Sequence, residues 1–428
     1  MTKKLWRTKE AETSDQIDKF LIEEDIVLDK DLFIFDIEAT SAHIKGLESI
    51  GVLSSSELNK LLKSLKLLSK DFENGSFELT AEFEDCHSAI EFYLTEQLGD
   101  LGKKVHTGRS RNDQILVAMR LYTKSNLQEF KDLNIDIARA FLDQAEKNKD
   151  IPMPGYTHLQ RAMPSSWGLW FASFAESFLD NIALIESTMN WIDANPLGSA
   201  AGYGVNLPLN RSLLTKILGF KRKQINSLYI QNSRGKYDLE VIGTLKQSLL
   251  DIRRFSWDMS LFLTEEFNLL SIDDSYTTGS SIMPNKKNPD VVEILRAKYS
   301  IIAGHYSELE NLLSLPSGYH RDLQLTKRSL IHSFNTAIRT VSILPGLIKS
   351  IDINTVNSKN AITDEMRMTD YAYKLVEQGI PFREAYRLTK SSKKNKDLTI
   401  KNNNSKRSPG SPGNLELQLL RKKLNAYE

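Results

Sequence analysis

A long run of apolar residues at helical spacing constrains the fold of this chain more than any other feature. From Trp167 onward, large apolar side chains recur at three- and four-residue steps, the period of one helix face: Trp170, Phe171, Phe174, Phe178, Ile182, Ile185 and Met189. The other faces of this segment carry few polar residues. The segment is therefore predicted to be a long helix buried among other helices.

Three further segments show the same kind of pattern, within residues 127–141, 239–252 and 291–315. Alternating strand patterns are scarce, and no glycine-rich phosphate loop follows a strand. Several helices of this length predict an all-α fold built around a helical bundle. A length of 428 residues exceeds one ordinary core, so two or three domains are expected.

Composition excludes several classes of partner. The 56 basic residues nearly cancel the 55 acidic ones, which gives no indication of a nucleic-acid or membrane-surface partner. The single cysteine, Cys86, cannot form an internal disulfide, and no Cys/His spacing typical of metal ligands occurs. The first residues lack the apolar core of a secretory signal, and no apolar run is long enough to span a membrane. These features predict a cytoplasmic protein without a metal or cofactor.

Polar residues concentrate in three segments that precede predicted helices: HTGRSRNDQ (106–114), MPGYTHLQRAMP (153–164) and TTGSSIMPNKKNP (277–289). The last is expected to end with Asn288 as an N-cap and Pro289 as the first helical residue. Free N–H groups at a helix start favour anions, and with Lys286 and Asn288 they would form a clamp for a dicarboxylate.

Taken singly, each segment has an ordinary structural interpretation. A Gly-Ser-Ser sequence beside Lys and Asn is usually a surface turn before a capped helix, and one histidine in a loop is more often structural than catalytic. It is the combination of these segments, in order, that favours a functional interpretation.

The segment GSSIMPNKKNP resembles the signature loop of the fumarase/aspartase superfamily, whose members cleave C–N or C–O bonds and release fumarate. Five other segments resemble the argininosuccinate lyase family: EDCH (84–87), HTGRSRNDQ, MPGYTHLQRAMP, RDLQLTK (321–327) and LVEQGIPFREA (375–385). The resemblance covers approximately residues 5–390.

This resemblance implies an all-α fold of three domains whose long helices form the centre of a homotetramer, with active sites built from three subunits. The expected domains are an N-terminal helical domain (1–107), a central bundle (108–355) and a small C-terminal helical domain (356–428). The last contains a polar stretch, 391–413, that is expected to be flexible because it has very few apolar residues.

The resemblance also implies a mechanism in which a β-proton is removed from argininosuccinate and arginine leaves from fumarate. Ser280 matches the base, which must act as an alkoxide because a neutral hydroxyl is a weak base. Lys286 would stabilise charge on the substrate carboxylates, and His158, paired with Glu293, matches the general acid or proton relay.

The remaining matches are to residues that contact substrate in the family. They are Thr40 (in place of a serine), Asp85, Arg111, Asn112, Thr157, Arg234, Asn288, Tyr319, Gln324 and Lys327. His87 and Arg109, in contrast, are expected to have structural or supporting roles.

Two segments depart from the family pattern. After Asn226-Ser227 the usual SDRD-like sequence is replaced by one that keeps Arg234 but has Ser233 and Gly235 in place of the flanking acids. PLGSAAGYG (196–204) also differs. Two alternatives therefore stay open: the same elimination on a modified succinyl-amine, and a catalytically silent structural relative of the crystallin kind.

Overall fold

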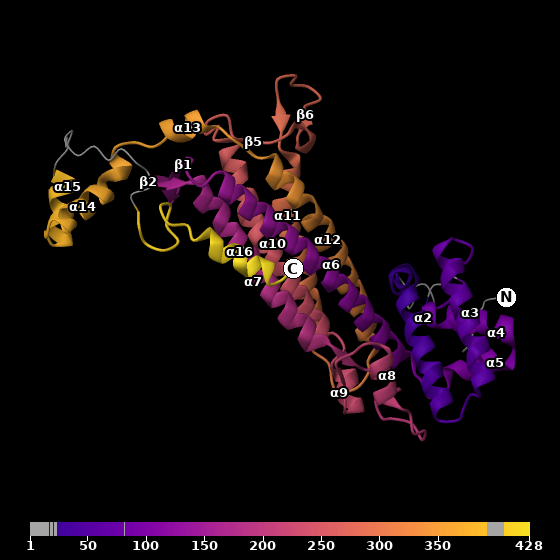
Figure 1. The fold of residues 1–428 in the computed structure, drawn as a ribbon. Coiled ribbons are helices and arrows are strands. Elements are labelled where there is room, and N and C mark those ends of the chain that lie inside the picture. Colours follow the sequence, from indigo (N-terminus) through magenta and orange to yellow (C-terminus); the bar gives the residue numbers. More distant parts are fainter. Residues whose placement is uncertain (1–16, 18–19, 21–23, 81, 392–405) are drawn as a thin grey trace. The chain divides into compact units, whose positions relative to one another are not determined.

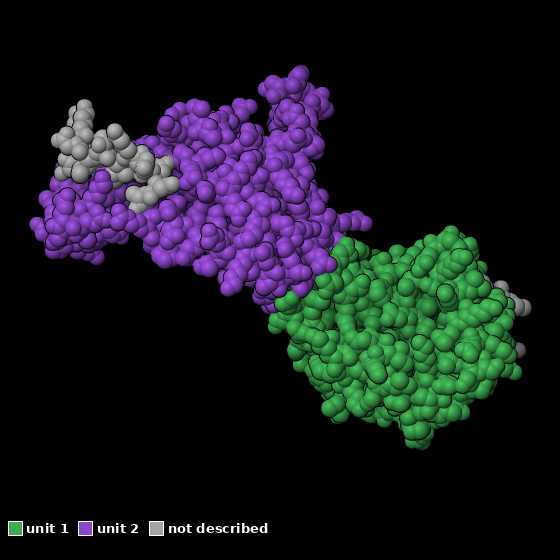
Figure 2. Space-filling model, in the orientation of Figure 1, with its two compact units in different colours: residues 1–129, 185–245, 302–336 green, residues 130–184, 246–301, 337–428 purple. Residues whose placement is uncertain are grey.

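The computed structural model describes residues 17, 20, 24–80, 82–391 and 406–428, and helices dominate them (Figure 1). The predicted all-α class is confirmed. The chain divides into two compact units, coloured separately in Figure 2. Unit 1 comprises residues 1–129, 185–245 and 302–336, and unit 2 comprises residues 130–184, 246–301 and 337–428.

Five long helices contribute residues to both units, because each crosses a unit boundary along its length. They are α6 (Arg111–Lys147), α7 (Trp167–Ile192), α10 (Lys236–Phe262), α11 (Asp290–Leu312) and α12 (Thr326–Ser350). The sequence patterns predicted α6, α7, α10 and α11, and α11 ends three residues before the predicted Leu315.

The N-terminal part of unit 1 is a cluster of helices around an apolar core of residues such as Phe33, Leu47, Leu65 and Ile90. Its elements are α2 (Asp25–Ser49), α3 (Ser55–Glu73), α4 (Cys86–Leu98), α5 (Asp100–Lys103) and the 3-10 helix η1 (Lys104–His106). Helix α2 presents a polar stripe beside this core, with Asp29, Asp36 and Thr40 buried. One residue of this stripe, Asp29, lines a cavity of unit 1.

The rest of unit 1 consists of short elements attached to the long helices: β3 (Ala194–Asn195), α8 (Arg211–Ile217), β4 (Arg222–Lys223), α9 (Ser227–Asn232) and η3 (Arg321–Leu325). Asp113, fully buried at the start of α6, accepts the N–H groups of Gly198 (3.0 Å) and Ala200 (2.9 Å). The unusual segment 196–204 thus folds around one carboxylate.

Unit 2 has an aromatic core in which Phe141 of α6 contacts Phe174 and Phe178 of α7 and Phe255 of α10, with ring centroids 5.1–5.9 Å apart. Gln144 of α6 donates a hydrogen bond to the Ile348 carbonyl of α12 (3.1 Å). These contacts form the predicted helical bundle within unit 2. No helix among the described residues combines the length and apolarity that crossing a membrane requires.

Short strands and helices complete unit 2. The strands pair as β1 (Pro152–Thr157) with β2 (Gln160–Ser166), β5 (Leu270–Ser271) with β8 (Asp352–Ile353), and β6 (Thr278–Gly279) with β7 (Lys287–Asn288), all antiparallel. The helices are η2 (Asp274–Tyr276), α13 (Thr355–Asn360), η4 (Glu365–Arg367), α14 (Met368–Glu377), α15 (Phe382–Ser391) and α16 (Leu417–Asn425).

Two local predictions were wrong. Residues 153–164 form most of the β1–β2 hairpin and not a loop, and its tip residues, His158 and Leu159, both have positive φ (55° and 57°). Helix α11 begins at Asp290, so Pro289 precedes it and Asn288 belongs to β7. The strand pairing of Asn288 with Thr278 holds it outside the helix.

The three-domain division stays a prediction. Residues 392–405 of the stretch expected to be flexible lie outside the described residues. From residue 406 onward the chain makes specific contacts: the Lys406 ammonium donates to the Pro164 carbonyl (2.7 Å), and Ser411 forms a β-bridge with Asn414.

Candidate active site

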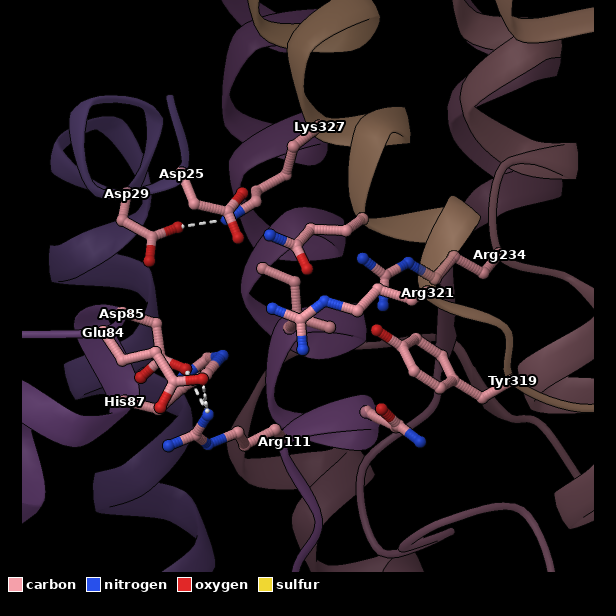
Figure 3. A pocket seen from close by; sticks show the side chains of 13 residues that line it. Asp25, Asp29, Glu84, Asp85, His87, Arg111, Arg234, Tyr319, Arg321 and Lys327 are labelled. Carbon is pink, nitrogen blue, oxygen red and sulfur yellow. Dashed lines mark hydrogen bonds and ion pairs between the residues drawn. The ribbon is translucent and has the colours of Figure 1, made fainter. Parts of the chain in front are cut away.

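Unit 1 contains a charged cavity of about 200 Å³ (Figure 3). It brings together side chains from α2, the start of α4, the start of α6, the α9–α10 connection, and the segment from residue 319 to the start of α12. The lining residues are Asp25, Asp29, Glu84, Asp85, His87, Arg111, Asn112, Ile115, Arg234, Tyr319, Arg321, Gln324 and Lys327.

At one side of the cavity, Lys327 is held by two aspartates of α2. Its ammonium lies 2.8 Å from Asp25 Oδ1 and 2.6 Å from Asp29 Oδ1, and its side chain is 4% exposed. Burial lowers the pKa of Lys327, but the two carboxylates outweigh it and raise the pKa well above its ordinary value. Lys327 is therefore a permanent cation whose charge the protein itself already neutralises.

A second ion-pair group joins α4 and α6. Asp85 caps α4 by accepting the Ser88 N–H (2.7 Å), and Arg111 lies 3.3 Å from Asp85 and 2.9 Å from Glu84. Burial raises the pKa of Asp85, but His87, Arg111 and the Ser88 hydrogen bonds outweigh it, so the pKa is lowered. Asp85 is thus a fixed anion beside the guanidinium of Arg111.

Arg234 differs from the other cations of the cavity. It is only 6% exposed, and its guanidinium lies 5.5 Å from the centre of the Tyr319 ring. Within the described part of the chain it has neither an ion pair nor a side-chain hydrogen bond. Burial lowers its pKa, although Tyr319 and nearby acids oppose this. A buried guanidinium that has no carboxylate partner favours the binding of an anionic ligand.

Behind the cavity, His87 pairs with the fully buried Asp36, with its Nδ1 2.6 Å from the carboxylate. Burial lowers the pKa of His87, but the charge and hydrogen bond of Asp36 outweigh it and raise the pKa. His87 therefore lies at the cavity wall as an imidazole that Asp36 orients and holds protonated.

Asp36, Cys86 and His87 also have the donor types of a metal site, since their ligand atoms lie within 4.8 Å of one another. However, two ligand atoms of a tetrahedral ion lie roughly 3.3 Å apart, and the 2.6 Å between His87 and Asp36 is a hydrogen-bond distance. Burial and neighbouring acids raise the pKa of the Cys86 thiol well above its ordinary value. The three residues form an ion pair with a neutral thiol beside it.

Asp36→Asn is expected to destabilise the protein by about 2–3 kcal/mol at pH 6, because it leaves a buried imidazolium without its counter-charge. The raised pKa of His87 means that the pair's contribution is fully present below about pH 6.5 and is lost as pH rises through the folded-state pKa. The deficit of the variant should therefore shrink between pH 6 and pH 9. Urea unfolding at both pH values measures it, with Glu48→Gln, a partly exposed acid of the same helix, as control. An equal deficit at both pH values would contradict this.

The predicted base, Ser280, lies in unit 2, in the connection between β6 and β7. Its Oγ accepts the N–H groups of Ile282 (3.3 Å) and Met283 (3.0 Å). Lys286 is exposed in the same connection, and its N–H donates to the Met283 carbonyl (3.1 Å). Two N–H donors on one hydroxyl oxygen are the local environment that an alkoxide requires.

The other predicted residues of unit 2 lie on two elements. Thr157 and His158 are exposed at the β1–β2 turn, and Glu293 is exposed in the first turn of α11. Glu293 lies 3.6 Å from Arg296 on its own helix. Within one chain, over the residues described, neither an ion pair nor a hydrogen bond joins His158 to Glu293, so this pairing stays a prediction.

The predicted site residues therefore form two groups. Seven line the unit 1 cavity: Asp85, Arg111, Asn112, Arg234, Tyr319, Gln324 and Lys327. Six belong to unit 2: Thr157, His158, Ser280, Lys286, Asn288 and Glu293. Thr40 lies outside the cavity, fully buried in α2, where its hydroxyl accepts a hydrogen bond from Arg109 (2.9 Å).

Four charged cavity residues, Asp25, Asp29, Glu84 and Arg321, and the apolar Ile115 were not predicted, and His87 was expected only in a supporting role. Asp25 and Asp29 have a recognisable spacing, since residues four apart lie on one face of a helix. Glu84 and Arg321 are the first residues of the matched segments EDCH and RDLQLTK, so the sequence offered a signal for both.

Comparison with known proteins agrees with this architecture. The sequence model of the lyase family matches residues 9–304. The fold is similar to that of EDDS lyase in complex with formate (TM-score 0.75, 24% identity, 89% of this chain and 76% of that one). It is also similar to a class II fumarase from Schistosoma mansoni (TM-score 0.72, 16% identity, 85% and 84%). The fold is thus that of the fumarase/aspartase superfamily of lyases.

Similar proteins of known name identify the family within this superfamily. The chain is 46% identical over 431 residues to argininosuccinate lyase of Xanthomonas campestris pv. campestris, covering all of both proteins. It is 49% identical over 387 residues to that of Xanthomonas oryzae pv. oryzae, covering 90% of each. The chain belongs to the argininosuccinate lyase family.

Proposed function

We propose that this chain is a C–N lyase that reversibly cleaves argininosuccinate to arginine and fumarate, the last step of arginine synthesis, in the cytoplasm. The observation that carries the proposal is the unit 1 cavity, which gathers Arg111, Asn112, Arg234, Tyr319 and Lys327 from distant parts of the sequence. Its lining includes both acidic and basic side chains, as a substrate with carboxylate, ammonium and guanidino groups requires.

The chemical step is removal of a proton next to a carboxylate, followed by loss of the nitrogen on the adjacent carbon. The proton is weakly acidic, so the base must be strong and the carbanion must be stabilised as an aci-carboxylate. Ser280 serves as the base in its alkoxide form, and the Ile282 and Met283 N–H groups on its Oγ support that form.

Lys286 and Asn288, in the same hairpin, stabilise the charge that develops on the carboxylate. His158 relays a proton to the leaving nitrogen, with Glu293 orienting it. The two-residue turn between β1 and β2 places His158 at the exposed tip of the hairpin, where a substrate can reach its imidazole.

We also propose that the active protein is a homotetramer whose sites combine residues of different subunits. Ile282 and Met283 follow the proposed base by two and three residues and are 82% and 44% exposed. Apolar side chains at these exposures, next to a catalytic serine, favour burial against another chain. In such an assembly, Glu293 of one subunit would pair with His158 of another.

The alternatives are not favoured. A modified succinyl-amine as substrate and a catalytically silent relative both fit the fold, but the curated relatives are named for argininosuccinate. Ser280, Lys286, Asn288, His158 and Glu293 are all present, which argues against a silent protein.

Fumarate release tests the proposal directly. Purified protein given argininosuccinate is expected to produce a steady rise in ultraviolet absorbance, and arginine with fumarate should yield argininosuccinate in reverse. Absence of both reactions under conditions where the protein is folded would reject the assignment. Turnover of only an acylated or shortened succinyl-amine would favour the first alternative.

A further inference from the structure

The β1–β2 hairpin that carries His158 is a weak structural element on its own. It is a two-stranded sheet, and isolated two-stranded hairpins are marginally stable in water. In its middle Pro154 pairs with Pro164, and two prolines cannot exchange N–H···O bonds. The register then shifts between Pro154 and Tyr156, which interrupts the ladder again. The turn of the hairpin is thus joined to its base by an interrupted ladder and requires support from other elements.

The C-terminal segment supplies a hydrogen bond at this interruption. The Lys406 ammonium donates to the Pro164 carbonyl (2.7 Å), although the two residues are 242 positions apart in the sequence. Burial lowers the pKa of Lys406, and the negative charge of Asp370 in α14 opposes this effect. An ordinary surface lysine keeps its ammonium in water, so the partial burial indicates that the surrounding chain holds Lys406 at the carbonyl.

The chain that follows Lys406 is fixed by a compact turn. Within this turn the Gly410 N–H donates to the Asn414 carbonyl (2.8 Å). Leu415 then packs against the start of α7, where a Cβ at Gly168 would lie 2.9 Å from Leu415 Cδ1. The turn therefore returns the chain to α7, the helix that directly follows β2.

Helix α16 attaches the end of this segment to α6 (Figure 1). Its Leu420 and Leu424 are buried, and its Arg421 lies 2.7 Å from Asp143 and 3.0 Å from Glu146 of α6. Because exposed ion pairs contribute little, burial of the two leucines gives most of the attachment. The segment 406–428 is thus fixed on the two helices that flank the hairpin in sequence, and Lys406 is a donor held in place.

We propose that Lys406 is a positioning residue that holds the β1–β2 hairpin, and with it the imidazole of His158, in place for proton transfer. The inference rests on the proposed function and adds the C-terminal segment to the parts that the reaction requires. Lys406 acts at Pro164, between the base and the turn of the hairpin, where the ladder is interrupted. A proton relay works only within hydrogen-bond reach of the reacting atom, so a displacement of about 1 Å can cost about 100-fold in rate.

Steady-state cleavage of argininosuccinate measures this role. Lys406→Met keeps the apolar stem and removes the donor. It is expected to lower kcat about 10- to 100-fold and to change KM less than about threefold, because the unit 1 cavity is not altered. Lys406→Arg, which keeps a charged donor, should retain kcat to within about threefold. An unchanged kcat in Lys406→Met would overturn the proposal, as would a loss of the same size in Lys406→Arg.

The matched control is Lys422→Met, because Lys422 is an exposed lysine of α16 in the same segment. It should leave both kcat and KM unchanged. Circular dichroism would confirm that all variants keep the helical content of the wild type. If Lys406→Met does not fold, Lys406→Gln, whose amide reaches one bond less far and carries no charge, replaces it in every measurement.

A double-mutant cycle shows whether the effect passes through His158. In a His158→Asn background the relay is already removed, so adding Lys406→Met should lower kcat by less than about threefold. A further loss as large as in the wild-type background would show that Lys406 acts independently of His158 and would reject the proposal.

Amide hydrogen exchange separates this proposal from the proposed function, because it requires no turnover. Peptides covering residues 152–166 are expected to exchange at least about threefold faster in Lys406→Met than in the wild type, while peptides of α16 keep their rates. Failure of the wild type to cleave argininosuccinate, together with faster exchange in the hairpin, would reject the lyase assignment and leave Lys406 as the residue that holds the hairpin. Unchanged exchange in the hairpin would reject that role, whatever the protein cleaves.

Discussion

Ser280→Ala is expected to lower the rate of argininosuccinate cleavage by about 10³- to 10⁴-fold while leaving the fold intact. The hydroxyl oxygen of Ser280 accepts two backbone N–H groups, of Ile282 and Met283. In the proposed mechanism those donors stabilise an alkoxide in the reacting state, and alanine removes the base altogether. Fumarate release at saturating substrate measures the loss in kcat.

Ser281→Ala is the matched control, because Ser281 is the exposed neighbour in the same connection. It should retain turnover to within a few-fold. Circular dichroism and size-exclusion chromatography would confirm that both variants keep the helical content and the oligomeric state of the wild type. Near-normal turnover by Ser280→Ala would remove Ser280 from the role of base.

The fold was predictable wherever one helix face is apolar. Helix α7 follows its apolar spacing so closely that Trp167, Phe171 and Phe178 are fully buried. The β1–β2 hairpin was not predictable, because its turn requires positive φ at His158 and Leu159. Asn-Gly sequences normally indicate such turns, and a His-Leu pair gives no such signal.

The candidate site was predictable where the chain carries a family segment and not where it depends on helix α2. Arg111, Asn112, Gln324 and Lys327 lie in matched segments and line one cavity. Helix α2 buries several polar side chains, so its sequence pattern does not say which of them face a cavity. Tertiary packing decides this: Asp25 and Asp29 reach Lys327, whereas Thr40 is covered by Arg109.

Lys327→Met is expected to destabilise the protein by about 3–5 kcal/mol at pH 8. The lysine is almost fully buried between Asp25 and Asp29, so its removal leaves two carboxylates in the cavity without their counter-charge. Urea unfolding followed by circular dichroism, at one fixed protein concentration, measures the loss. Arg328→Met is the control, since Arg328 forms a half-exposed pair with Glu24 and should cost below about 1 kcal/mol.

The pH dependence distinguishes this mechanism from a simple loss of packing. In the wild type the pKa of Lys327 is raised, so its contribution is complete below about pH 10.5 and is lost only as pH rises through the folded-state pKa. In the variant, burial without the lysine raises the pKa of Asp25 further above its ordinary value. Protonation of Asp25 as pH falls then removes part of the uncompensated charge, so the deficit should be smaller at pH 5 than at pH 8. A deficit that is independent of pH would show that packing by the lysine stem, and not its charge, holds this side of the cavity together.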